Sequence, residues 1–170
     1  ATVKYNYTRS NAAIKKNSVA TKVERLVQHA SQLTSTVTRA QIATLNAERL
    51  SNERAVKQIG GSAVGNLVAD SQIALMQNLQ RPVDFAFTNS GGVRDDLVTT
   101  VKNGQKIVTW EAAQKVQPFS NFVYTGTLTG AQIIAVLNEQ FTGGRGLEVA
   151  GLHYTYNDAG IVDVFVGNAT

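Results

Sequence analysis

The sequence predicts a mixed α/β domain of the α+β class, preceded by a helical connector. Residues 11–50 contain neither proline nor glycine and consist largely of good helix formers. After residue 57, segments with strand-like alternation and segments with helical periodicity follow one another without the regular repeat of a doubly wound sheet. We therefore expect a connector over residues 1–57 and a compact domain over residues 58–170.

The composition is that of one globular domain. The 170 residues are 43% apolar and 16% charged, and this length and mixture suffice to bury a core. No apolar run approaches the roughly 18 residues that span a bilayer, so no membrane span is expected. Cysteine is absent and histidine occurs twice, which excludes a thiolate metal site and makes a histidine-rich one unexpected.

The net charge of +4 comes from an excess of basic residues in the first 57 positions. Surfaces that bind nucleic acid usually interleave aromatic residues with their basic ones. Tyr5 and Tyr7 stand apart from the main basic run. We interpret the basic residues as the solvated face of a helix, and we expect no nucleic-acid partner.

The expected elements follow from periodicity and capping residues. In residues 11–50, apolar side chains at intervals of three and four predict one or two amphipathic helices, and no strand is expected before residue 57. Later helices are expected after Ser62, Thr109 and Thr129, ending near Gln80, at Val116 and at Gly143-Gly144. Strands are expected over 83–88, 106–108 and 122–128, and a hairpin over 152–156 and 161–166.

The first segment with chemical potential is the turn from Asn89 to Arg94, which follows a predicted strand. It offers a carboxamide that donates and accepts, and a guanidinium suited to an anion. Between them Gly91 and Gly92 permit unusual dihedral angles and close approach of a ligand. The alternative is a purely structural turn in which Arg94 pairs with the neighbouring Asp95 or Asp96.

The second segment is the bend Gln117–Phe122, in which proline presents Phe119 beside the amide of Asn121. An aromatic ring displayed on a loop can stack on a nucleobase, a contact of roughly 1–3 kcal/mol in nucleic-acid complexes. The alternative for Phe119 is packing in the core.

Four motifs occur in order: GGSAVGNLVAD at 60–70, DFAFTNSGGVR at 84–94, VQPFSN at 116–121 and LTG at 128–130. In this order and spacing they resemble the C-terminal, substrate-binding domain of the 5'-nucleotidase family over about residues 54–166. The similarity is greatest to secreted bacterial members of the 5'-nucleotidase and UDP-sugar hydrolase type. The resemblance implies an extracellular, periplasmic or cell-surface protein.

The resemblance also implies a division of labour. In the family, an N-terminal metallophosphoesterase domain binds two divalent metal ions that activate water, while the C-terminal domain holds the nucleotide or nucleoside. Accordingly, we expect no catalytic residue, metal ligand or cofactor in this chain, and we expect the two metal ions in an N-terminal domain outside it.

The same resemblance assigns the substrate-binding residues. Asn89 and Arg94 match the amide and the arginine that contact substrate, and Phe119 matches one of two rings that enclose the base. The backbone of Gly91 and Gly92 is expected to face the ribose. Further contacts are expected from Asn121 and Arg54, with Arg49 and Lys57 as rivals of Arg54.

Two departures leave a second interpretation open. Gly61 stands where the family pattern has glutamate, and Thr170 ends the chain before a second aromatic residue and a Gly-Gly-Asp-Gly motif. We expect a domain truncated at its C-terminal end. The alternative function is a catalytically inactive, nucleotidase-like binding or interaction module.

Overall fold

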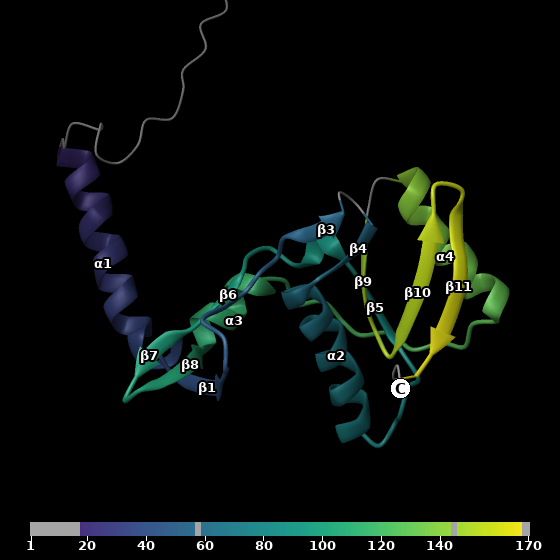
Figure 1. The fold of residues 1–170 in the computed structure, drawn as a ribbon. Coiled ribbons are helices and arrows are strands. Elements are labelled where there is room, and N and C mark those ends of the chain that lie inside the picture. The colour runs from purple at the N-terminus through teal and green to yellow at the C-terminus, as the bar shows by residue number, and fades with distance from the viewer. Residues whose placement is uncertain (1–17, 57–58, 144–145, 168–170) are drawn as a thin grey trace, which may run out of the picture. The chain divides into compact units, whose positions relative to one another are not determined.

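The computed structural model describes residues 18–56, 59–143 and 146–167 (Figure 1). The chain divides into two compact units, Ala1–Arg39 and Ala40–Thr170. The described residues form four α-helices and several small antiparallel sheets. The predicted mixed α+β class is confirmed.

Helix α1 (Ser18–Thr38) forms most of the described part of the first unit, and none of the described residues of this helix is buried. The helix prediction is wrong beyond it, because β1 (Gln41–Thr44), β2 (Arg49–Leu50) and β3 (Arg54–Val56) follow. These segments pair with strands later in the chain, and such pairing overrides local helix propensity. The part of the prediction that covers residues 11–17 lies outside the described residues.

Among the described residues, the strands of the second unit pair with antiparallel neighbours. In the three-stranded sheet, β8 (Gln105–Thr109) lies between β1 and β7 (Thr100–Lys102). Two-stranded pairs join β2 to β6 (Leu97–Val98) and β3 to β4 (Ile59–Ser62).

The three helices of the second unit begin where their capping residues predicted. They are α2 (Ala63–Asn78), α3 (Trp110–Val116) and α4 (Gly130–Gly143). The Ser62 hydroxyl accepts from the Gly65 N–H at 3.0 Å, and the Thr109 hydroxyl accepts from the Ala112 N–H at 3.2 Å. Thr129 accepts from the Gln132 N–H at 3.3 Å. Each cap satisfies a donor that the first helical turn leaves unpaired.

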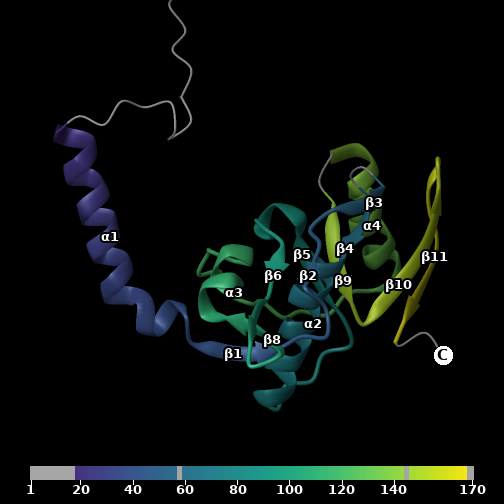
Figure 2. The ribbon, with the colours of Figure 1, turned by 60° about the vertical axis from the view of Figure 1, so that its left-hand side comes forward.

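Two hydrophobic clusters stabilise the second unit. The first joins α2, α3, β6, β8 and the segment after the Ser90–Gly92 turn, through Val64, Val93, Leu97, Val108 and Val116. In the second, Ile133 and Leu137 of α4 pack with Leu152 of β10 (Leu152–Asn157). Helix α4 also contacts β11 (Gly160–Val166) and lies against the β10–β11 hairpin in both ribbon views (Figure 2).

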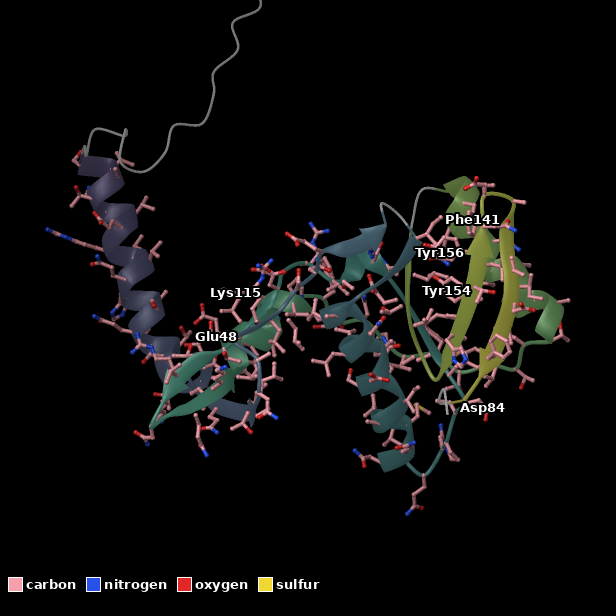
Figure 3. All side chains as sticks on the ribbon, viewed as in Figure 1. Glu48, Asp84, Lys115, Phe141, Tyr154 and Tyr156 are labelled. Carbon is pink, nitrogen blue, oxygen red and sulfur yellow. The ribbon has the colours of Figure 1, made fainter. Side chains whose placement is uncertain are left out.

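The predicted hairpin at the C-terminal end is confirmed as β10 (Leu152–Asn157) and β11 (Gly160–Val166). Aromatic contacts join it to α4, since the rings of Phe141 and Tyr156 meet edge to face with centroids 5.8 Å apart (Figure 3).

The remaining strand predictions fared unevenly. The strand expected at 106–108 is present within β8. The one expected at 83–88 begins only at Ala86 and forms β5 (Ala86–Asn89), which pairs with β9 (Leu147–Ala150). The strand expected at 122–128 is wrong: this segment is irregular and exposed, without a pairing partner among the described residues.

Candidate functional site

The candidate site is built on the turn that follows β5. Asn89 ends the strand, and a short 3₁₀ turn covers Ser90–Gly92. The Ser90 N–H donates to the Gly146 carbonyl at 3.1 Å, and the Arg94 N–H donates to the Val116 carbonyl at 2.9 Å. Backbone hydrogen bonds at both ends therefore hold the turn between the start of β9 and the end of α3.

Space, rather than unusual dihedral angles, explains the glycine pair. Neither Gly91 nor Gly92 has a positive φ, so neither glycine uses the unusual dihedral angles that it permits. A Cβ atom on Gly91 would lie 3.3 Å from the Asn89 side-chain nitrogen. One on Gly92 would lie 3.4 Å from the Asn89 oxygen and 3.7 Å from Nε2 of Gln117. The glycines leave room for two carboxamides over the turn.

Arg94 and Phe119 meet beside this turn. The Arg94 side chain is exposed and donates from Nη1 to the Gly91 carbonyl at 3.2 Å. Its guanidinium carbon lies 6.0 Å from the ring centroid of Phe119, at the outer limit of a cation–π contact. Phe119 is 49% exposed and is not packed in the core. The structure thus brings together the arginine and the ring named from the sequence.

The local ion pair considered for Arg94 does not form. Within the described residues Arg94 takes part in no salt bridge, and Asp96 instead binds Arg49, with Nε and Oδ2 2.6 Å apart. Oδ1 of Asp96 accepts from the Asn52 N–H at 2.7 Å. The hydrogen bond from the Asn52 N–H and, as the smaller cause, the one from the Arg49 guanidinium hold the pKa of Asp96 below its ordinary value.

Asn121 lines the same groove as Asn89 of the turn. Gln117 is a further polar residue of this groove, and the sequence motifs did not predict it as a site residue. Asn89, Gln117 and Asn121 line one groove of about 440 Å³. Gln117 belonged to the motif around Phe119, but its side chain carried no separate signal. Only the folded chain places its carboxamide against Gly92.

Arg54 lies in β3 and forms an ion pair with Glu148 of β9, through Nη2 and Oε1. The Arg54 side chain is 17% exposed, and that of Glu148 is fully buried. Oε2 of Glu148 also accepts from the Ser62 N–H at 2.7 Å. One carboxylate therefore joins β3, β9 and the start of α2. Of the two rivals of Arg54, Arg49 pairs with Asp96, and Lys57 lies outside the described residues.

The side chains of Glu148 and Asn66 fill the space beside two glycines. A Cβ atom on Gly65 would lie 2.1 Å from Oε2 of Glu148, and one on Gly61 would lie 2.1 Å from the side-chain oxygen of Asn66. The Cβ atom on Gly61 would also lie 3.0 Å from Oε2 of Glu148. The space at Gly61, where the family pattern has glutamate, is thus occupied by Asn66 and Glu148.

The described residues contain no group of three His, Asp or Glu side chains placed to hold a metal ion. Among the described helices, none combines the length and apolar character that crossing a membrane requires.

Comparison with known proteins shows what this chain is similar to. The sequence matches the family described as 5'-nucleotidase, C-terminal domain, over residues 17–165. It is 42% identical to a cell wall protein of Listeria monocytogenes over 104 residues, which is 60% of this chain and 13% of that protein. It is 30% identical to a 5'-nucleotidase of Vibrio vulnificus over 123 residues, which is 70% of this chain and 20% of the relative.

Solved structures show the same fold. The 5'-nucleotidase precursor of Thermus thermophilus matches with a TM-score of 0.65 and 25% identity, over 86% of this chain and 29% of that one. A Haemophilus influenzae NAD nucleotidase matches with a TM-score of 0.57 and 22% identity, over 86% of this chain and 28% of that one. In each comparison this chain spans less than a third of its relative.

The buried ion pair gives a first prediction. Replacing Glu148→Ala should lower the free energy of unfolding by roughly 3 kcal/mol, because it leaves the Arg54 guanidinium and the Ser62 N–H without their partner. Urea denaturation followed by circular dichroism measures the loss. Glu111→Ala, which removes an exposed partner of Lys115, is the matched control and should change stability little. Equal stabilities for the two variants would contradict the role given to Glu148.

The Asp96 cluster gives a pH dependence. Because the folded-state pKa of Asp96 is lowered, its contribution to stability is present above the unfolded pKa and is lost as pH falls through the folded value. Asp96→Asn should therefore lower the melting temperature at neutral pH, and its difference from wild type should shrink below about pH 4. Asp158→Asn, in the exposed β10–β11 turn, serves as the control. A difference that stays constant with pH would count against this account.

Proposed function

Because the chain belongs to the family of 5'-nucleotidase C-terminal domains, we propose that it recognises the nucleotide substrate of a phosphohydrolase that cleaves nucleoside 5'-phosphates. The observation that carries the proposal is the meeting of Asn89, Arg94 and Phe119 around one glycine turn. A guanidinium that can bind an anion lies beside an exposed aromatic ring. This pair suits a ligand that has a charged part and a flat aromatic part.

Each residue has a role that its surroundings support. Arg94 uses one N–H donor for the Gly91 carbonyl. Because a guanidinium has five N–H donors, others remain for the phosphate. The half-exposed ring of Phe119 takes the face of the base. Asn89 and Asn121 supply hydrogen bonds, and the backbone of Gly91 and Gly92 faces the ribose.

Arg54 is also a proposed substrate contact, but unlike Arg94 it is held in an ion pair. It is committed to Glu148 through Nη2 and is largely buried. Its other donors are the ones it would offer to substrate, and the pair would hold them in a fixed orientation.

In our proposal, hydrolysis takes place in a part of the protein that lies outside this chain. Two divalent metal ions would be held by an N-terminal metallophosphoesterase domain and would activate the attacking water there. Binding and orientation by the present domain lower the barrier by positioning. The relatives include a cell wall protein and a 5'-nucleotidase precursor, which supports a location at the cell surface, in the periplasm or outside the cell.

A second candidate is a binding module without catalytic activity. It is favoured by Gly61, whose missing side chain is replaced in space by Asn66 and Glu148, and by the similarity to a cell wall protein. The two candidates differ in whether the complete polypeptide releases phosphate from AMP. Intact mass of the native protein, followed by an assay with Mn²⁺ or Zn²⁺, separates them.

We predict that the chain binds AMP and that Arg94→Ala weakens AMP binding about tenfold or more, because a charge-assisted contact to the phosphate is lost. Isothermal titration calorimetry of the 170-residue chain measures the affinity. Adenosine, which lacks the phosphate, should bind Arg94→Ala and wild type alike. In the complete enzyme the same variant should lower kcat/KM for AMP.

The matched control is Lys102→Ala, which removes an exposed cation from β7. It should leave the affinity for AMP unchanged. If Arg94→Ala and Lys102→Ala bind AMP equally well, Arg94 does not contact the phosphate and the site assignment fails.

A further inference from the structure

Helix α1 carries an apolar stripe that plays no part in the proposed nucleotide site. Five large apolar side chains of the stripe are between 53% and 72% exposed: Val19, Val23, Leu26, Leu33 and Val37. The exposed Ala30 completes the stripe. Since none of the described residues of α1 is buried, the whole stripe is open to a partner.

The stripe has the spacing of a coiled-coil seam. Its residues stand at positions 19, 23, 26, 30, 33 and 37, which is a seven-residue repeat with apolar residues at positions a and d. A helix that packs on a globular domain has a wider stripe with a period of 3.6 residues, whereas here Val27 is the large apolar side chain that α1 adds beside the seam. A seam with a period of 3.5 residues stays in contact with a second helix that coils around it. We therefore expect a helix to cover α1.

The residue types in the seam favour two parallel helices. Leu26 and Leu33 fall at position d, and Val23 and Val37 fall at position a. Valine at a together with leucine at d favours a parallel pair over higher assemblies. A second copy of α1 supplies this same pattern, so each layer of the seam would pair a residue with its own counterpart.

The positions beside the seam are compatible with a second copy. Lys22 and His29 fall at position g, which in a parallel pair faces position e of the other helix. Val27 and Thr34 hold position e. The aliphatic part of Lys22 can cover Val27 of the second copy while its ammonium group stays in water. Lys22 therefore faces no cation across the seam.

The composition of α1 also indicates that a partner stabilises it. Valine, serine and threonine, which are weaker helix formers than alanine or leucine, make up about half of the helix. A single helix of 21 residues is marginal in water, and most helices in proteins are stabilised by packing of their apolar face. Pairing two such stripes would remove on the order of 1,200 Å² from water, the lower end of the range for specific interfaces.

We propose that the chain forms a parallel homodimer through a two-stranded coiled coil of α1 helices. The seam runs from Val19 to Val37, with Ala30 near its centre. Because the interface is small and alanine contributes little to it, association is reversible and depends on protein concentration. The dimer is independent of nucleotide binding, so the proposed function can fail without affecting it.

Sedimentation equilibrium of the 170-residue chain tests the association. Monomers should convert to dimers as the concentration rises. Leu26→Ser should raise the dissociation constant of the dimer at least about tenfold, because each dimer loses two buried leucine side chains. Gln28→Ser puts the same residue on the opposite, exposed face of α1, with a similar loss of helix propensity, and should leave the constant unchanged. A chain that stays monomeric at every concentration, or equal constants for the two variants, would overturn the proposal.

A disulfide test checks the parallel orientation without removing a leucine. The sequence has no cysteine, so a single introduced thiol can link only to its counterpart in a second copy. Ala30→Cys places that thiol at position a, where a parallel pair brings the two Cα atoms close enough for a disulfide. Under mild oxidation it should form covalent dimers much faster than Gln28→Cys on the opposite face. Equal rates for the two variants, or a dimer that Ala30→Cys fails to link, would show that the copies do not meet along this seam in parallel.

Discussion

The buried carboxylate of Glu148 is the interaction on which the second unit depends. It binds the Arg54 guanidinium and the Ser62 N–H, and it occupies the space that Gly65 leaves open. A charge removed from water is tolerated only where partners satisfy it. Glu148 therefore favours the arrangement in which β3, β9 and the start of α2 lie together.

This constraint reaches the candidate site through strand pairing. Glu148 lies opposite Thr88 in the β5–β9 pair, and Asn89 lies opposite Leu147. A shift of one residue in this register would turn Glu148 to the other face of the pair. The burial of Glu148 thus favours the register that pairs Asn89 with Leu147 and holds the following turn beside the start of β9. The stability of the unit and the geometry of the site have a common origin.

The capping and hairpin signals in the sequence were reliable. Ser62, Thr109 and Thr129 each cap a helix by accepting from a backbone donor three residues later, so the whole interaction lies within one short window. The hairpin over β10 and β11 is equally local. The motifs also named Asn89, Arg94 and Phe119, which the fold brings to one turn.

The sequence by itself determined the mixed α+β class, the helix starts, the hairpin and the family, because each depends on neighbours in the chain or on short motifs in order. Only the tertiary structure decided that residues 41–56 contain strands, since β1 and β2 pair with β8 and β6 far along the chain. It likewise decided that Arg54 meets Glu148, 94 residues away, and that Gln117 faces Gly92. Contacts between distant segments depend on packing and on the burial of charge, which no local pattern of residues records.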